Sequence, residues 1–305
     1  MELNIVKCAL CKETKSLRDS HLIPSFVFKW IKNTSATGYL RNSANANLRR
    51  QDGRKVKLLC NDCEIILSLS EKRFSEIIFY PYVNDELSDD FVCQNKISSF
   101  KYEDWLLKFV ISIHWRHLVT NNLEKNKLSD KQWKILNDIK ENWRLFLLGK
   151  TNYTGKADSH MLFHQSLAAA DGNFPTNLNK NANFYLLRAA DSTIVSSKSK
   201  LAIYNKIGPI SFFTSLKPGK LINANDSRIH LKGNYKVIQR LNNIDLSEFI
   251  YITRPNEAMS VFNFSEFQQQ KIKASMLSDP IRTITSKTIS AQTADKILSM
   301  KLDRQ

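Results

Sequence analysis

The chain has 305 residues, of which 42% are hydrophobic and 24% are charged, proportions that are ordinary for soluble globular proteins. It is too long for a single small zinc module and can bury at least one core, so we expect two domains. No run of about 18 apolar residues is present, which excludes a membrane-spanning helix, and the opening MELNIVKCALC is not a signal peptide. We therefore expect a cytoplasmic protein with no membrane partner.

The charge of the chain is strongly positive. Lysine and arginine number 45 against 29 aspartate and glutamate residues, which gives a formal net charge of +16. This excess favours a polyanionic partner, and nucleic acid is the first candidate. A cationic surface that serves only solubility is the alternative.

Four of the five cysteines form two C-x-x-C pairs, Cys8 with Cys11 and Cys60 with Cys63. Thiolates two residues apart can reach one tetrahedral zinc ion from a tight turn, and a second pair closes the site with four sulfur ligands. The pattern predicts a structural zinc ion in a reducing compartment rather than a disulfide framework. The fifth cysteine, Cys93, is expected to be a buried and unreactive thiol.

The stretch over residues 33–57 lacks apolar periodicity and is expected to be an exposed insertion. Only one acid, Asp52, accompanies its cations, which are Arg41, Arg49, Arg50, Arg54, Lys55 and Lys57. These side chains are candidates for contact with a nucleic-acid backbone. An ordinary solvated loop is the alternative interpretation.

The second cysteine pair leads into CEIILSLSEKRFSEIIF, whose apolar residues roughly follow the period of a helix. A zinc knuckle, an intervening hairpin and a helix that begins at the second knuckle make the treble-clef arrangement. Both nucleases and binding modules use it, so the fold alone does not decide the function.

The rest of the chain is predicted to be helical first and then rich in strands. Apolar residues at three- and four-residue intervals predict amphipathic helices over 102–118 and 130–148, the second ending before Gly149. Short β-rich runs from about 184 to 253, separated by turn residues, predict an antiparallel meander. These runs are FYLLRAA, KLAIYNKI, PISFFT, RIHL, YKVIQ and FIYIT.

Two more helices are expected at 265–277 and 290–302, with a mobile segment SKTISAQT between them. The expected fold class is therefore α+β. A zinc domain would occupy residues 1–95, and a helical and antiparallel β domain would occupy 96–305.

The motifs of the first quarter of the chain stand in a specific order. The cysteine pair Cys8–Cys11 is followed by Ser20-His21-Leu22-Ile23-Pro24, then by L-L-C-x-x-C-E from Leu58 to Glu64, and then by Glu71. This order resembles the zinc-containing HNH, or ββα-metal, endonucleases. It looks most like a bacterial group with the pattern C-x-x-C, S-H-x-I-P and C-x-x-C-E. The resemblance covers residues 8 to about 76.

In that family a histidine acts as general base on the water that attacks phosphorus, and one divalent metal ion neutralises charge on the scissile phosphate. The resemblance therefore implies that His21 is the catalytic base and that Glu64 is a catalytic metal ligand. Glu71 would be a second metal ligand or would orient a basic partner. Carboxylate ligands would favour Mg²⁺ or Mn²⁺ at this site, beside the structural Zn²⁺.

Two positions depart from the family pattern. Ser20 stands where an acid or histidine often precedes the catalytic histidine, and the expected asparagine is absent from RKVKLL. Asp19 is a candidate substitute, although it would need a local twist of the strand. In the alternative interpretation, His21 only stabilises the hairpin and Glu64 only favours a helix N-terminus.

Other residues of chemical interest are expected to be structural. His114 with His117, and His160 with His164, have spacings compatible with one metal ion but lack convincing carboxylate companions, so surface or packing roles are expected. Four tryptophans are expected to lie in the core rather than to stack on bases, namely Trp105, Trp115, Trp133 and Trp143.

Together these features favour a metal-dependent, HNH-like endonuclease that hydrolyses phosphodiester bonds in DNA. Its second domain would supply specificity or a surface for a regulatory protein partner, as in phage defence. The alternative is a non-catalytic treble-clef zinc protein that binds nucleic acid or a protein partner.

Overall fold

The computed structural model describes residues 6–42, 45–85, 98–121, 128–170, 174–217, 219–237, 241–260 and 263–304. Cys93 and the expected domain boundary near residue 95 lie outside these ranges, so both expectations stay predictions. Helices and strands are mixed along the chain, in agreement with the α+β class. Within the described residues, no helix combines the length and apolar character needed to cross a membrane.

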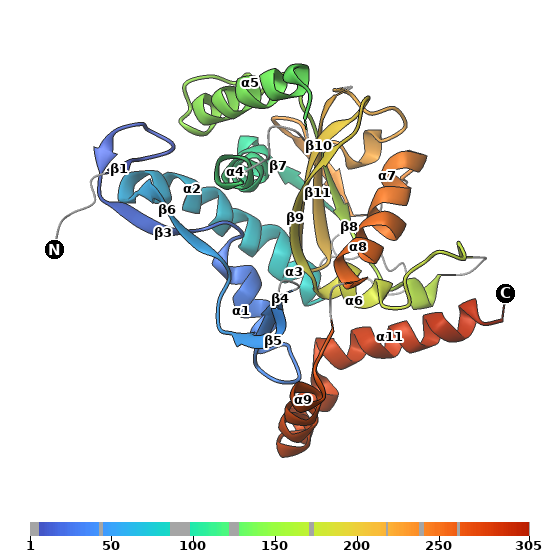
Figure 1. Cartoon of the computed structure of the whole chain (residues 1–305). Helices are drawn as coiled ribbons and strands as arrows, with labels where there is room; N and C mark the ends of the chain where they lie inside the picture. Colours follow the sequence, from blue (N-terminus) through green and yellow to red (C-terminus); the bar gives the residue numbers. More distant parts are fainter. Residues whose placement is uncertain are drawn as a thin grey trace.

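The first part of the chain is a tight turn, a two-stranded hairpin and a helix (Figure 1). Its strands are β1 (Val6–Lys7), β2 (Thr14–Lys15), β3 (Leu17–His21) and β6 (Lys55–Cys60). β1 pairs with β2, and β3 runs antiparallel to β6. Helix α2 (Asn61–Phe74) starts directly after β6, which confirms the helix expected at the second cysteine pair.

The segment between β3 and β6 is folded rather than a simple exposed loop. It contains α1 (Ser25–Asn33), β4 (Leu40–Asn42) and β5 (Asn45–Arg50), and β4 pairs antiparallel with β5. Residues more than 200 positions away hold it: the Arg282 guanidinium donates to the Ser35 carbonyl (3.0 Å), and the Ser265 N–H donates to the Asn47 side chain (2.8 Å). The expectation of an exposed insertion was therefore only partly right.

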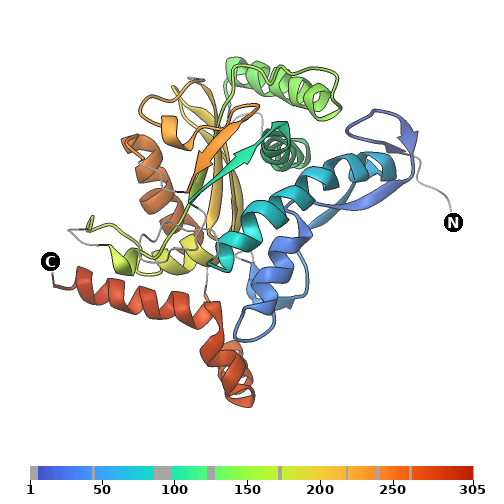
Figure 2. The same cartoon turned by 180° about the vertical axis from the view of Figure 1, so that it is seen from behind.

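The centre of the molecule is a four-stranded antiparallel sheet. Its strand order is β8 (Asp158–Phe163), β11 (Ile210–Lys217), β10 (Leu201–Ile207) and β9 (Ala190–Ser196). Helices cover both faces, as Figures 1 and 2 show from opposite sides. On one side lie α2 and α4 (Asp104–Thr120), and on the other lie α6 (Ala182–Arg188), α7 (Ile244–Glu248) and α8 (Arg254–Ser260).

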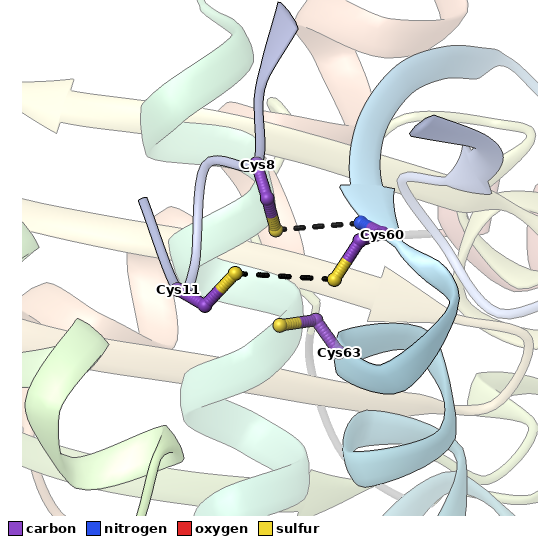
Figure 3. Close-up of side chains that lie close together, drawn as sticks. All are labelled: Cys8, Cys11, Cys60 and Cys63. Carbon is purple, nitrogen blue, oxygen red and sulfur yellow. Dashed lines mark hydrogen bonds between the residues drawn. The ribbon is translucent and has the colours of Figure 1, made fainter. Parts of the chain in front are cut away.

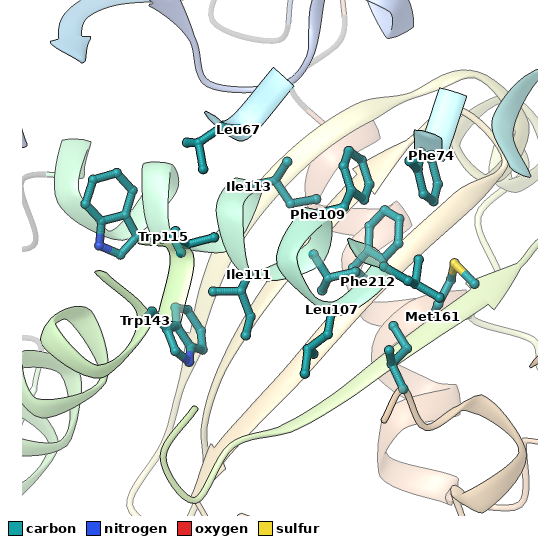
Figure 4. Packing of buried hydrophobic residues seen from close by; sticks show 14 of the residues in the cluster. Leu67, Phe74, Leu107, Phe109, Ile111, Ile113, Trp115, Trp143, Met161 and Phe212 are labelled. Carbon is teal, nitrogen blue, oxygen red and sulfur yellow. The ribbon is translucent and has the colours of Figure 1, made fainter. Parts of the chain in front are cut away.

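Alternating residues of the sheet belong to different hydrophobic clusters. Phe212 packs edge-on against Phe74 of α2 and Phe109 of α4, with ring centroids 5.6 and 5.7 Å apart (Figure 4). The next residue, Phe213, instead faces Phe249, at 5.9 Å. Because successive strand residues point to opposite faces, the sheet is buried on both sides.

The two expected central helices are confirmed as α4 and α5 (Asp130–Leu147). Ser129 and Gln132 form a reciprocal capping box at the start of α5, which satisfies backbone N–H groups that have no partner inside the helix. At its end, Gly149 has φ +70°, a left-handed conformation that glycine adopts without a steric penalty.

The meander prediction was partly wrong. KLAIYNKI and PISFFT do form β10 and β11, but FYLLRAA lies mostly in α6 and FIYIT is a π-helical segment (Phe249–Thr253). The prediction also missed β8, which lies outside the expected range. These short apolar runs are buried in either structure, so their periodicity did not separate strand from helix.

The remaining elements complete the body and the C-terminal end of the chain. They are a π-helical segment (Ser75–Phe79), α3 (Tyr80–Val83), β7 (Ser99–Tyr102), β12 (Gly233–Lys236), α9 (Glu266–Ser278), α10 (Pro280–Thr285) and α11 (Lys287–Leu302). The two C-terminal helices expected from the sequence are confirmed as α9 and α11. The mobile segment was wrong, because Ser286 caps α11 and most of SKTISAQT is its first half.

Residues on both sides of the expected domain boundary share one hydrophobic cluster. It joins Cys8, Leu67 and Phe74 of the first part to Phe109 and Phe212 of the second. At the edge of this cluster, the Arg144 side chain of α5 donates to the Leu10 carbonyl (2.8 Å) within the first cysteine turn. The first quarter of the chain is thus packed against the body of the protein.

Candidate functional site

The four paired cysteines converge on one point (Figure 3). Their sulfur atoms all lie within 4.8 Å of one another, and the sulfurs of Cys11 and Cys60 are 3.9 Å apart. Four sulfurs around a tetrahedral zinc ion, each about 2.3 Å from it, would be about 3.8 Å apart. The donor set and its spacing therefore fit a metal ion such as zinc.

The local backbone conformation positions the cysteine side chains at this site. Lys12 has φ +67°, and its N–H donates to the Cys8 carbonyl (2.9 Å), which closes the turn that carries the first pair. The Cys60 N–H donates to the Cys8 sulfur at 3.3 Å. Burial by itself would raise the pKa of Cys8, but backbone N–H donors lower it to about 7. Burial and the neighbouring thiols raise the pKa of Cys63, so a bound cation is needed to keep all four sulfurs ionised.

His21 lies at the end of β3, on the outer side of the hairpin. Its Nε2 is 3.0 Å from each carboxylate oxygen of Asp52, in the turn between β5 and β6. The ring also packs against Phe28 of α1, with centroids 6.4 Å apart and planes at 27°. The imidazole is only partly exposed, and no hydrogen-bond partner of its Nδ1 is found among the described residues. His21 therefore has one occupied and one free nitrogen.

Glu64 lies in the first turn of α2, on the inner side of β3. The Ser20 hydroxyl donates to Glu64 Oε1 and also accepts the Leu59 N–H (3.3 Å). The second Glu64 oxygen is 3.9 Å from Nη2 of Arg116. The Glu64 side chain is 27% exposed, so it has both protein partners and some access to solvent.

Glu71 does not point into an open site but pairs with Arg116 of α4. The Arg116 Nη1 donates to Glu71 Oε1, and the arginine side chain is 2% exposed. A buried guanidinium needs such a counter-charge, because an unpaired charge inside a protein is strongly destabilising. Of the two roles that the resemblance implied for Glu71, the structure shows the contact with a basic partner.

The side chains of the neighbouring residues Ser20 and His21 thus point to opposite sides of β3 and meet different partners. His21 meets Asp52 and Phe28 on one side, whereas Ser20 meets Glu64 on the other, as expected for successive residues of a strand. Within the described residues, the cysteines are the single group of three or more side chains arranged to hold a metal ion.

The candidate nucleic-acid contacts fall into two classes. Four of the six cations have partners within the protein. The Arg41 guanidinium donates to the Ala46 carbonyl (2.7 Å), Arg49 lies over the Tyr39 ring (4.6 Å), Lys55 pairs with Asp52 (2.6 Å) and Lys57 pairs with Asp19 (3.3 Å). Arg50 and Arg54 are exposed, and neither has an ion-pair partner among the described residues. They are the cations most available to a ligand.

The histidine pairs and tryptophans behave as expected. His114 is buried beside Asn205, and burial with the nearby His117 lowers its pKa to about 3. His160 and His164 lie on and just after strand β8, where four residues span about 13 Å, too far for one metal ion. Trp105, Trp115 and Trp143 are buried, and Trp133 packs partly buried against the core.

A serine, a histidine and an aspartate also meet beside β8. His160 Nδ1 is 3.0 Å from the Ser227 hydroxyl, and its Nε2 is 3.1 Å from Asp158. The arrangement resembles a hydrolytic triad in composition, but the serine and histidine are at most 2% exposed, and Arg228 binds the carboxylate through two nitrogens. No substrate reaches such a hydroxyl, so we interpret this group as a packing network.

Sequence reasoning missed two residues of this region. In the sequence, Asp52 stands out only as the single acid of a basic stretch, and Asp19 is the candidate acid beside His21, yet Asp19 pairs with Lys57. Arg116 was not noticed at all. Its signal was a lone arginine in an apolar helix, a position that calls for a buried acidic partner.

No protein-family model matches this chain, and no curated protein or solved structure matches it. The likeness to HNH endonucleases therefore depends on the motif residues and their arrangement.

Proposed function

We propose that this protein is a metal-dependent, HNH-like endonuclease that hydrolyses phosphodiester bonds in DNA. The observation that carries the proposal is the state of His21, which is partly exposed, is oriented by a carboxylate at Nε2 and has no partner at Nδ1 among the described residues. A neutral imidazole with a free nitrogen can accept a proton from water near pH 7. The turn, hairpin and helix around the cysteine cluster also agree with a treble-clef, ββα-metal domain.

In the proposed reaction, His21 Nδ1 removes a proton from the water that attacks phosphorus. The zinc ion of the cysteine site takes no part, because four thiolates leave no open position. Glu64, the ligand for Mg²⁺ or Mn²⁺ that the resemblance implies, lies on the other side of β3 from His21 and is held by the Ser20 hydroxyl, so it would have to leave this network to bind an ion beside His21. Such an ion would supply positive charge to the scissile phosphate and the leaving oxygen.

The net charge of +16 and the exposed cations Arg50 and Arg54 support a polyanionic substrate. A nuclease with so few cues for target choice would endanger its own cell. Control by a protein partner or by modification of the target, as in a phage-defence effector, is therefore part of the proposal.

The decisive experiment compares the parent with His21→Ala in nicking of supercoiled plasmid in Mg²⁺ or Mn²⁺. Loss of a general base should slow nicking by about 10²- to 10⁴-fold. DNA binding and zinc content should stay unchanged, because the side chain does not contact the cysteines. His230→Ala, at an exposed histidine in another part of the chain, is the matched control. Equal nicking by parent and His21→Ala would refute the proposal.

A second candidate function is a non-catalytic zinc protein that binds nucleic acid or a protein partner. The network of Glu64, Glu71, Ser20 and Arg116 favours it, because these carboxylates already have partners. This candidate predicts DNA binding without cleavage in the parent, at every tested concentration of divalent metal ion. It also predicts that His21→Ala binds DNA like the parent.

A further inference from the structure

We propose that Asp52 is the positioning residue of His21: it holds the imidazole in the tautomer that carries its proton on Nε2 and so leaves Nδ1 as the base. The catalytic consequence rests on the proposed nuclease function. The tautomer itself does not, and it can be measured without any reaction.

The hydrogen bond between His21 and Asp52 can run in one direction only. Both oxygens of Asp52 lie 3.0 Å from Nε2 of His21. An ionised carboxylate can only accept hydrogen bonds, so the shared proton must belong to the imidazole. A neutral imidazole has one N–H, and placing it on Nε2 makes Nδ1 an acceptor.

Asp52 is ionised, and it is held in place by Lys55 and Gly53 as well as by His21. Lys55 donates to one of its oxygens (2.6 Å), and the N–H of Gly53 donates to the other (2.8 Å). Burial by itself would raise the pKa of Asp52, but hydrogen bonds from Lys55, His21 and Gly53 lower it to about 2. The carboxylate is thus an acceptor at every pH where the protein is expected to work.

The ring of His21 and the turn that carries Asp52 both pack against Phe28. Phe28 packs against the imidazole and also against Gly53, where an added Cβ would lie 2.0 Å from Phe28 Cε2. Glycine at this position therefore lets the turn approach α1 closely. The approach brings the turn that carries Asp52 onto the Phe28 ring that the imidazole also contacts.

The direct test is ¹⁵N NMR of the parent protein with labelled histidine, at a pH where the His21 ring is neutral. The signals of His21 are assigned by their loss in His21→Ala. We expect the shift pattern of the tautomer with the proton on Nε2. A proton on Nδ1, or an even mixture of the two tautomers, would overturn the inference, and this measurement needs no Asp52 variant.

Asp52→Asn gives the second test, because an amide of the same size can donate as well as accept. We expect the preference for the Nε2–H tautomer to weaken and plasmid nicking to fall by about 10- to 100-fold, as when the orienting partner of a functional histidine is lost. Asp52→Glu should recover part of both signals. Asp19→Asn, which removes a neighbouring acid bound to Lys57, is the matched control and should change neither.

The outcomes separate this inference from the proposed function. An unchanged tautomer in Asp52→Asn would overturn the inference whatever the nicking rate. If His21→Ala nicks DNA as fast as the parent while Asp52→Asn still shifts the tautomer, the nuclease proposal fails and the positioning role stands.

Discussion

Ser20 and His21 are neighbours on one strand, yet they belong to opposite environments. The Ser20 side is closed: the Ser20 hydroxyl donates to Glu64, and the buried Arg116 pairs with Glu71 and lies 3.9 Å from Glu64. The His21 side is open: the His21 ring packs against Phe28, its Nε2 is bound by Asp52, and its Nδ1 has no hydrogen-bond partner in the part of the chain that the structure describes. Ser20 and His21 therefore belong to two separate groups of interacting side chains.

We expect the Ser20 side of β3 to matter mainly for stability and the His21 side to matter mainly for function. The closed side carries buried charges whose removal should cost folding free energy. The open side carries partly exposed groups whose removal should change function more than stability. The following experiments test this division, from the largest expected effect to the smallest.

Replacement of Cys60 by serine should have the largest effect, because both sides of β3 are anchored at the cysteine site. Loss of one thiolate should weaken zinc binding and destabilise the first part of the chain, since binding of structural zinc in small domains contributes on the order of 10 kcal/mol. Zinc content per chain and thermal unfolding would measure this. Cys93→Ser is the control, and a Cys60→Ser protein that keeps a full zinc equivalent would contradict the four-sulfur site.

Arg116→Met tests the closed side. It leaves Glu71 without its partner while keeping an apolar side chain of similar length, so the free energy of unfolding should fall by about 3 kcal/mol. Denaturant unfolding would measure the loss. The exposed Arg73 of α2 gives the matched control, and Arg73→Met should change stability by less than about 0.5 kcal/mol. Equal effects of the two substitutions would show that the buried pair does not support the fold.

Groups in the interior and groups on the open side should affect stability in different pH ranges. His114 has a pKa lowered to about 3 by burial and by the nearby His117, so protonation favours the unfolded chain. The neutral form of His114 stabilises the fold fully above about pH 6.5, and this stabilisation is lost as the pH falls toward 3. At pH 5 the free energy of unfolding should be about 2 kcal/mol lower than at neutral pH because of this group. His114→Gln should reduce the loss of stability between pH 7 and 5 by this amount.

Asp52 should behave in the opposite range. Its pKa is lowered to about 2, so the ionised form favours the fold, and its contribution is lost only as pH falls from about 4 toward 2. Asp52→Asn should therefore remove part of the stability that the parent loses between about pH 4 and 2, which denaturant unfolding at these pH values would measure. An identical loss of stability in the parent and in Asp52→Asn over this range would contradict the stabilising role of the ionised carboxylate.

Arg54→Ala should have the smallest effect on stability, within about 0.5 kcal/mol, because this exposed side chain has no ion-pair partner among the described residues. If it contacts phosphate, the slope of log affinity for DNA against log salt should decrease by about 1. Arg41→Ala is the useful comparison, since Arg41 is held by Ala46 and lies over the Phe264 ring. If Arg41→Ala lowers the salt slope and Arg54→Ala does not, then Arg41 rather than Arg54 is the cation that contacts phosphate.

Much of the fold could be predicted locally. Helices α4 and α5 follow from the apolar period of their residues, a signal that acts within a few positions of the chain. The α6 and Phe249–Thr253 segments could not be predicted in this way, because both are short and apolar. Packing against the sheet, not period, decided their structure.

The sequence by itself determined the cysteine site, since two C-x-x-C pairs leave few other arrangements for a metal ion, and the cluster of Cys8, Cys11, Cys60 and Cys63 agrees. It also singled out His21, Glu64 and Glu71. Only the tertiary structure decided their partners, Asp52 for His21 and Arg116 for Glu71. These partners lie 31 and 45 positions away in sequence, and such long-range contacts depend on how β3, α2 and α4 pack rather than on any local pattern.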